Sequence, residues 1–333
     1  MGIMGILTNN KRDSNLKLKN TCYITSSLEA LLNLEEFITD IRSISEKLIK
    51  EKNMKIISEF KKLVNQRLVN TDSKVDPIEI KNILSEVDKK YKDNKQEDAN
   101  DFISLLLNEM IKEVKGIGYK KRENQYIPID EMDKEAYENI EKRFFNEYNS
   151  FLINLFYGKL KKEYFCPQHH KIKVNFQIYN MIEITNNNDK DSIEELLKNY
   201  QEEKEVNCEI NCEKCGIVDD FFLKTTICYL PYYFIIYLVN PIKNNNNDLE
   251  IKVSKFIEDK KENNYIYELI SVISYYGNFK RGHYICKFKR SKRWLKADDN
   301  DISTLSSYNI GKHDVILIFA KKQNEEEIFS YLN

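Results

Sequence analysis

Residues 20–32 read NTCYITSSLEALL, a cysteine followed directly by an amphipathic segment. The apolar positions behind Cys22 fall at helical spacing, and they are Leu28, Leu31, Leu32 and Phe37. This pattern predicts a helix that begins at Cys22, where the helix dipole and the free N–H groups favour a thiolate. A lone cysteine is also often a small buried residue, so this stretch leaves open whether Cys22 is a nucleophile or part of the core.

The helical pattern continues through the first half of the chain and then changes. Apolar positions repeat at helical spacing in further segments, which are residues 56–64, 78–87, 102–111 and 137–145. From about Lys159, apolar and polar residues alternate as they do in strands, for example in residues 174–178, 265–269 and 316–318. A helical half followed by a strand-rich half predicts an α+β fold and argues against a repeating βαβ sheet.

The composition excludes several classes of function. The chain has 333 residues, and its 52 Lys and Arg nearly balance its 53 Asp and Glu. This balance argues against a protein that binds nucleic acid through bulk charge. Only 9 glycines are present, and the signatures GxGxxG, GxxxxGK[ST], GxSxG and HExxH do not occur. The sequence therefore offers no sign of the common nucleotide-binding proteins, serine hydrolases or zincins.

The sequence predicts no membrane-spanning segment. Its most apolar run, residues 227–239, is interrupted by Pro231 and is shorter than the ~20 residues that a transmembrane helix needs. A buried strand is the expected structure there. The N-terminus lacks the pattern of a signal peptide, so an intracellular protein is expected, in the cytoplasm or the nucleus. In a reducing compartment, the 7 cysteines are expected to be catalytic, metal-binding or buried.

Two short motifs in the second half suggest a zinc site. Residues 166–169 read CPQH and residues 212–215 read CEKC. Two such pairs, held on two separate hairpins, supply ligands for tetrahedral zinc and leave no position open for water, so the site would be structural. The preferred ligands are Cys166, His169, Cys212 and Cys215. Cys208 and His170 are alternative ligands, and unrelated polar residues in loops would give the same pattern.

His283 is a candidate catalytic base. It precedes a short predicted strand, residues 285–288, and Asp298 and Asp299 follow at the end of the next one. Neighbouring strands would bring the imidazole and a carboxylate to the same edge of a sheet. With Cys22 they would form a triad of nucleophile, base and orienting group. The alternative is an ordinary histidine on the surface.

Further motifs follow in a fixed order along the chain. They are QEDANDF at residues 96–102, FYG at residues 156–158, LP at residues 230–231 and GHY at residues 282–284. Together with NTCY at residues 20–23 and the run from Trp294 to Asp298, this ordered set resembles the ubiquitin-specific proteases over about residues 15–320.

The resemblance implies a single papain-like catalytic domain over residues 1–333. Its parts would be a helical thumb (about 1–158), β fingers tipped by zinc (about 159–230) and a β palm (about 231–333). The implied activity is a thiol-dependent deubiquitinase that cleaves the bond after the C-terminus of ubiquitin. Its partners would be ubiquitin and ubiquitinated proteins, with no nucleic acid and no membrane.

The resemblance also implies roles for individual residues. Cys22 would be the nucleophile, and His283 the general base and then the acid. Asp298 would orient the imidazole, with Asp299 as a second acidic neighbour. Substrate-binding residues would lie in the QEDANDF motif, namely Gln96, Asp98 and Asp101. The two aspartates would face the basic tail of ubiquitin, since carboxylates one turn apart on a helix can pair with arginines. The alternative for them is a solvated helix face.

Some positions depart from the family pattern. Lys17 stands where the family has the asparagine that donates to the oxyanion, so Lys17 or Asn20 is the candidate donor. Glu29 stands where the family has glutamine. The motifs leave three alternatives open, which are a catalytically weak ubiquitin-binding scaffold, a protease for a ubiquitin-like modifier and a zinc-binding interaction module.

Overall fold

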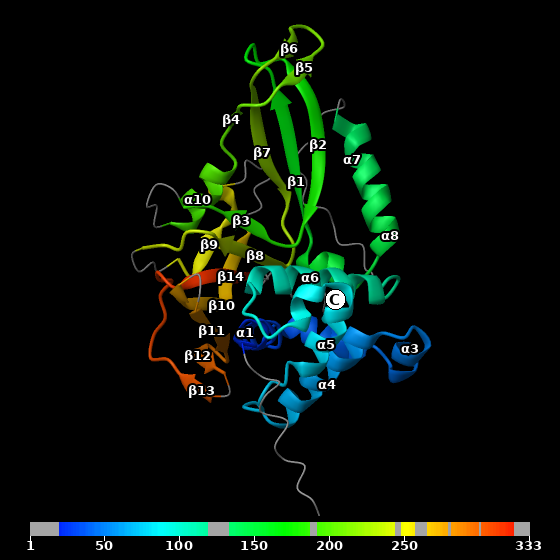
Figure 1. Cartoon of the computed structure of the whole chain (residues 1–333), viewed down its shortest axis with the longest axis vertical. Coiled ribbons are helices and arrows are strands. Elements are labelled where there is room, and N and C mark those ends of the chain that lie inside the picture. The colour runs from blue at the N-terminus through cyan, green and yellow to red at the C-terminus, as the bar shows by residue number, and fades with distance from the viewer. Residues whose placement is uncertain are drawn as a thin grey trace, which may run out of the picture.

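The computed structural model describes residues 20–118, 133–186, 192–243, 248–256, 265–278, 281–299 and 301–322. Figure 1 shows a body made of helices and a sheet, from which a narrower sheet projects along the long axis. The α-helices are α1 (Cys22–Leu31), α2 (Glu35–Ser43), α3 (Glu46–Glu51), α4 (Lys55–Val69), α5 (Ile78–Val87), α6 (Ala99–Glu113), α7 (Lys134–Ile140), α8 (Asn146–Tyr148), α9 (Phe151–Phe156) and α10 (Ile193–Tyr200). Other helical turns are Lys89–Lys92, Glu141–Phe145 and Val253–Lys255.

The projecting sheet has four strands in the order β2-β1-β7-β4, all antiparallel. A two-stranded hairpin, β5-β6, lies at its tip (Figure 1). The strands are β1 (Gly158–Phe165), β2 (Lys171–Tyr179), β4 (Lys204–Val206), β5 (Ile210–Cys212), β6 (Gly216–Val218) and β7 (Phe221–Tyr229). Because β1 and β7 are long, the turn after β1 and the β5-β6 hairpin are carried far from the body.

The sheet of the body has eight strands in the order β13-β12-β11-β10-β14-β8-β3, with β9 beside β10. All its pairs are antiparallel except β3 with β8. The strands are β3 (Ile182–Ile184), β8 (Tyr233–Leu238), β9 (Glu250–Lys252), β10 (Ile266–Asn278), β11 (Arg281–Arg290), β12 (Arg293–Asp298), β13 (Asp301–Thr304) and β14 (Asp314–Lys321).

This sheet is buried on both faces, and successive residues of its central strands enter two different cores. Ile316 and Ile318 of β14 join the core shared with the helices of the first half, whereas Leu317 and Phe319 join the core on the side of α10. Side chains of a strand alternate between faces, so apolar residues at consecutive positions are expected where both faces are covered.

The helix α1 lies at the junction of the helical half and this sheet, where it packs against α6, β10 and β11. Every residue from Tyr23 to Leu31 is buried. Tyr23 contacts the ring of Phe102 in α6, with ring centroids 5.8 Å apart. Cys22, the first residue of this buried helix, is therefore fixed in position by packing on several sides.

The predicted α+β fold, with helices first and strands later, is confirmed. Two details of the prediction are wrong. The helical pattern that ends at Phe37 divides into α1 and α2, because the chain turns after Leu31. The single strand expected over residues 227–239 is two strands, because the chain leaves β7 at Leu230-Pro231 and enters the other sheet as β8. Among the described residues, the helices are too short or too polar to cross a membrane.

Candidate active site and metal centre

Cys22 is the first residue of α1, and its side chain is partly buried. Burial raises the pKa of the Cys22 thiol, and backbone hydrogen bonds with Tyr284 and Tyr23 oppose this effect. The sequence analysis expected the helix N-terminus to favour a thiolate. In the structure burial is the larger effect, so the neutral thiol predominates near pH 7 and a base is needed to remove its proton.

His283 and Asp298 lie on the neighbouring antiparallel strands β11 and β12. The Nε2 atom of His283 is 2.8 Å from Oδ1 of Asp298, and Lys296 Nζ is 3.2 Å from the other oxygen. The hydrogen bond with His283 lowers the pKa of Asp298, and Lys296 lowers it further. Asp298 is therefore a carboxylate at neutral pH and can hold the imidazole ring in one orientation.

Asp299 is the more distant of the two carboxylates. Its Oδ2 atom is 4.0 Å from Nε2 of His283, and its side chain is 63% exposed, against 38% for Asp298. Its backbone adopts a left-handed conformation with φ of 51°, which turns the chain away at the end of β12. Asp298 is the carboxylate that contacts the imidazole directly.

The thiol of Cys22 lies beside the strand that carries the imidazole. Its hydrogen bond with the backbone of Tyr284 places it next to the residue that follows His283, and α1 packs against β11. Because Asp298 engages Nε2 of the ring, Nδ1 is the nitrogen left to face a thiol. The structure thus places a thiol, an imidazole and a carboxylate on three neighbouring elements, α1, β11 and β12.

Gln96 contacts the backbone of Gly282, the residue before His283. Its Nε2 donates to Gly282 O at 2.8 Å, and its Oε1 accepts from Gly282 N at 3.1 Å. A Cβ added at position 282 would lie 2.1 Å from the ring of Tyr275, so a larger residue there would displace this ring. The resemblance assigned Gln96 to substrate binding, and these contacts, between residues far apart in the sequence, had no signal in the sequence.

The two acidic residues of the QEDANDF motif have different surroundings. Asp98 is the N-cap of α6, and its Oδ1 accepts a hydrogen bond from Tyr284 Oη at 3.2 Å. Asp101 is exposed in the first turn of α6 and pairs with Lys90 Nζ at 2.9 Å. Asp98 therefore contacts β11, whereas Asp101 faces the turn that carries Lys90 and is the more accessible of the two.

A cleft of about 1310 Å³ begins beside these residues, and its lining includes Asn20, Asp98, Tyr275 and His313. Asn20 Nδ2 donates to Asn94 O at 2.8 Å, which leaves one N–H of the amide for another acceptor. Lys17, the other predicted oxyanion donor, lies outside the described residues.

His313 is a residue of the cleft that the sequence analysis did not single out. Its ring stacks on Tyr276 with centroids 4.2 Å apart.

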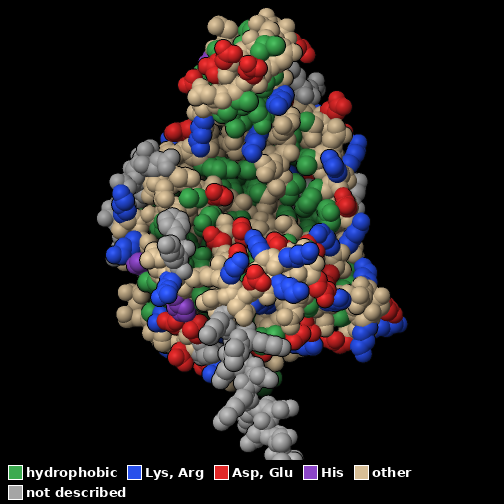
Figure 2. Space-filling view, in the orientation of Figure 1, with side chains coloured by type: hydrophobic (Ala, Val, Ile, Leu, Met, Phe, Trp, Pro, Cys, Tyr) green, Lys and Arg blue, Asp and Glu red, His purple; other side chains and the backbone are tan. Residues whose placement is uncertain are grey.

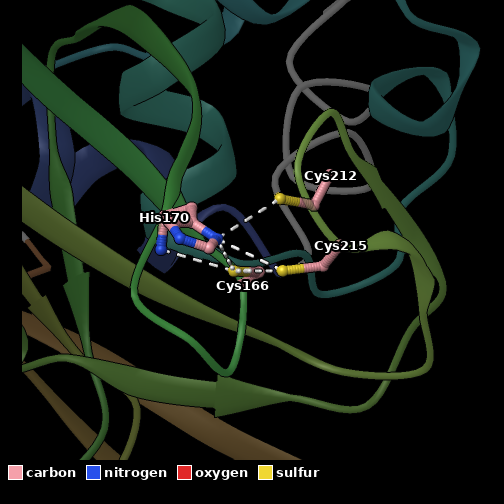
Figure 3. A group of neighbouring side chains, drawn as sticks. All are labelled: Cys166, His170, Cys212 and Cys215. Carbon is pink, nitrogen blue, oxygen red and sulfur yellow. Dashed lines mark hydrogen bonds between the residues drawn. The ribbon is translucent and has the colours of Figure 1, made fainter.

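Cys166, His170, Cys212 and Cys215 converge at the tip of the projecting sheet (Figure 3). His170 Nδ1 lies 3.2 Å from the sulfur of Cys215 and 4.0 Å from that of Cys212, and the sulfurs of Cys166 and Cys215 are 3.7 Å apart. In a tetrahedral zinc site with Zn–S bonds of ~2.3 Å, ligand sulfurs are separated by about 3.8 Å. The three sulfurs and one imidazole nitrogen therefore fit a zinc ion.

The structure places His170 in this cluster, not His169, which the sequence analysis preferred. His169 adopts a left-handed backbone conformation with φ of 54°, and its ring stacks on Phe222 with centroids 5.2 Å apart. The turn closes when Cys166 N donates to His170 O at 3.0 Å. In this turn the ring of His169 points toward Phe222, and the ring of His170 points toward the cysteines.

Comparisons with known proteins agree on one family. The model of the family "Ubiquitin carboxyl-terminal hydrolase" matches residues 14–324. The chain is similar to ubiquitin carboxyl-terminal hydrolase Usp2 of Drosophila melanogaster, with 23% identity over 87% of this chain and 32% of that protein. It is similar to human ubiquitin carboxyl-terminal hydrolase 2, with 20% identity over 91% of this chain and 54% of that protein. The chain thus spans about a third of the length of the first relative and about half of the length of the second.

Solved structures share the fold. The SAGA deubiquitinase module of Ubp8, Sgf11, Sus1 and Sgf73 bound to monoubiquitin matches with a TM-score of 0.66 and 17% identity, over 92% of this chain and 68% of that chain. The same module bound to ubiquitin aldehyde gives the same values. Each match covers nearly the whole of this chain.

Proposed function

Since the chain belongs to the ubiquitin carboxyl-terminal hydrolase family, we propose that it is a thiol-dependent deubiquitinase. It would hydrolyse the peptide or isopeptide bond that follows the C-terminus of ubiquitin. The observation that carries this proposal is the His283–Asp298 hydrogen bond of 2.8 Å beside the thiol at the start of α1. The pair is partly exposed, and a cysteine hydrolase requires a base and an orienting group of this kind beside its thiol.

The reaction follows from the states of these side chains. His283 takes the proton of the Cys22 thiol through Nδ1, and the sulfur attacks the carbonyl carbon of the last ubiquitin residue. His283 then gives the proton to the leaving amine, and an acyl-enzyme remains. Water, deprotonated by His283, hydrolyses the thioester. Asp298 stabilises the imidazolium that forms at each proton transfer.

The substrate would lie along the cleft and over the projecting sheet. Figure 2 shows hydrophobic side chains gathered on this face of the molecule, over the lower part of the projecting sheet. Asp98 lines the cleft, and together with Asp101, in the first turn of α6, it would attract the basic tail of ubiquitin. A ubiquitin-bound state of the Ubp8 module, which shares this fold, supports the same partner. We propose the thumb, finger and palm assignments over residues 1–158, 159–230 and 231–333 on the same grounds.

Zinc would hold the tip of the projecting sheet. When bound by Cys166, His170, Cys212 and Cys215, it supplies a rigid cross-link and no reactive position. The turn after β1 and the β5-β6 hairpin are short, so they bury little apolar surface of their own. Metal binding would therefore contribute directly to the folding of this tip.

One zinc ion per chain is expected by elemental analysis. His170→Ala removes a ligand, so this variant should retain much less zinc and its tip should become sensitive to proteolysis. His169→Ala is the matched control, because it removes a neighbouring imidazole that stacks on Phe222. Loss of zinc from His169→Ala together with full zinc in His170→Ala would reverse the ligand assignment.

Hydrolysis of ubiquitin with a fluorogenic group at its C-terminus tests the proposed function. The wild-type chain should release the fluorophore, and matched substrates made from ubiquitin-like modifiers should be cleaved more slowly. Faster cleavage of one of those modifiers would identify a protease for that modifier. Tight binding of ubiquitin with no turnover would identify a scaffold instead.

A further inference from the structure

A closed ring of hydrogen bonds joins α1 to the far end of β11. Arg67 donates to Glu29 Oε1 at 2.6 Å and to Thr71 O at 3.0 Å. Arg290 donates to the same Thr71 O at 3.2 Å and to Asn33 Oδ1 at 3.0 Å. Asn33 Nδ2 donates to Glu29 O at 2.7 Å and closes the ring.

The ring connects the two elements that carry the reacting groups. Glu29 lies seven residues after Cys22 on α1, and Arg290 lies seven residues after His283 on β11. Between them, α1 packs along β11. The other end of β11 is held where Gln96 bonds Gly282. The strand that carries the base is thus fixed to the helical half of the chain at both ends.

The one carboxylate of the ring, Glu29, forms a buried ion pair with Arg67. The side chains of Glu29 and Arg67 are 3% and 8% exposed, so each would be costly to bury without the other. Arg290 is less buried and also lies 3.7 Å from Asp72 Oδ1. Glu29 is one of the departures from the family pattern, which has glutamine there, so the ion pair with Arg67 belongs to this chain and not to the family pattern.

We propose that this ring is a positioning device, in which Arg290 fixes the register of α1 against β11 so that the Cys22 thiol meets the imidazole of His283. None of the ring's groups lines the cleft among the residues that the structure describes, so its effect on the reaction passes through α1 and β11. The proposal rests on the proposed function. It makes Arg290 and Asn33 positioning residues for the transfer of the thiol proton.

The experiment uses Arg290→Met, which removes the bonds to Asn33 and Thr71 and leaves the Glu29–Arg67 pair intact. A misplacement of about 1 Å can cost about 10²-fold in rate, so kcat for fluorogenic ubiquitin should fall about 10- to 100-fold, with KM within about twofold. Arg293→Met is the matched control. Arg293 pairs with Arg290 across the turn between β11 and β12, and its side chain is exposed, so this variant should have the kcat of the wild type. Asn33→Ala breaks the same junction from the other side and should lower kcat as well.

Two further readouts separate positioning from a merely structural role. The rate of alkylation of Cys22 by iodoacetamide, followed by mass spectrometry, should fall in Arg290→Met at pH 7. The difference from the wild type should narrow as the pH is raised, because a larger share of the thiol then ionises without help from a base. The double variant with both Arg290→Met and Asn33→Ala should have a kcat no lower than that of the slower single variant. Each change already breaks the same ring of hydrogen bonds, so their effects should not add. A lower melting temperature with wild-type kcat and wild-type alkylation at pH 7 would overturn the proposal. Absence of ubiquitin hydrolysis in the wild type would refute the proposed function instead, and the alkylation difference would still test the ring.

Discussion

Replacing Cys22 with alanine is expected to abolish hydrolysis of ubiquitin conjugates while ubiquitin binding stays nearly unchanged. The thiol is the only group at this position that can form an acyl-enzyme, because His283 and Asp298 act on its proton. Removal of a nucleophile in a hydrolase of this kind costs on the order of 10⁶-fold in kcat. Binding should persist, because the cleft and the projecting sheet keep their surfaces.

Steady-state hydrolysis and a binding titration with ubiquitin measure the two parts of this prediction. Cys286→Ala is a suitable control, because Cys286 is buried in the sheet and contacts Ser271, with Sγ and Oγ 3.7 Å apart. That variant should retain turnover even if its stability is lower. Turnover by Cys22→Ala would end the assignment of Cys22 as nucleophile.

Asp298→Asn is expected to lower kcat by about 10⁴-fold, the loss seen in a serine protease when the equivalent carboxylate becomes an amide. The amide of asparagine can donate an N–H to Nε2 of His283, the nitrogen that Asp298 contacts in the wild type. The single proton of the neutral ring is then held on the other nitrogen. Nδ1 would then carry the proton and could not take another from Cys22. The carboxylate also stabilises the imidazolium, and the amide does not.

Asp299→Asn is the matched comparison for this prediction, since Asp299 Oδ2 is 4.0 Å from the imidazole and more exposed. Its effect on kcat should be much smaller than that of Asp298→Asn. Both rates are measured with fluorogenic ubiquitin at saturating concentration. A larger loss from the change at Asp299 would mean that the two carboxylates have exchanged roles.

The sequence was sufficient to predict features that depend on local pattern. A short strand was predicted at residues 285–288 with a second strand beside it, and the structure has β11 beside β12. The strand β11 is longer than predicted, since it begins at Arg281 and includes His283. The helical spacing behind Cys22 predicted a helix that begins there, as α1 does. In each case the signal lies within a few residues of the feature, so no knowledge of distant contacts is needed.

Features that depend on backbone turns or distant contacts were not predictable. His169 and His170 are adjacent, and only the left-handed φ of His169 decides which ring faces the cysteines. The bonds of Gln96 to Gly282 and of Arg290 to Asn33 join residues that are 186 and 257 positions apart. The pKa of Cys22 depends on how deeply α1 is packed, which the pattern of α1 alone does not reveal.

The most direct test of the account is covalent labelling with ubiquitin that carries an electrophile at its C-terminus. Such a probe requires both recognition of ubiquitin and a thiol that His283 can activate. The account predicts one probe per chain, attached to Cys22 as mapped by mass spectrometry, with labelling lost in Cys22→Ala and strongly slowed in His283→Ala. Labelling at another cysteine, or labelling of Cys22 at the wild-type rate without His283, would contradict the proposed catalytic centre.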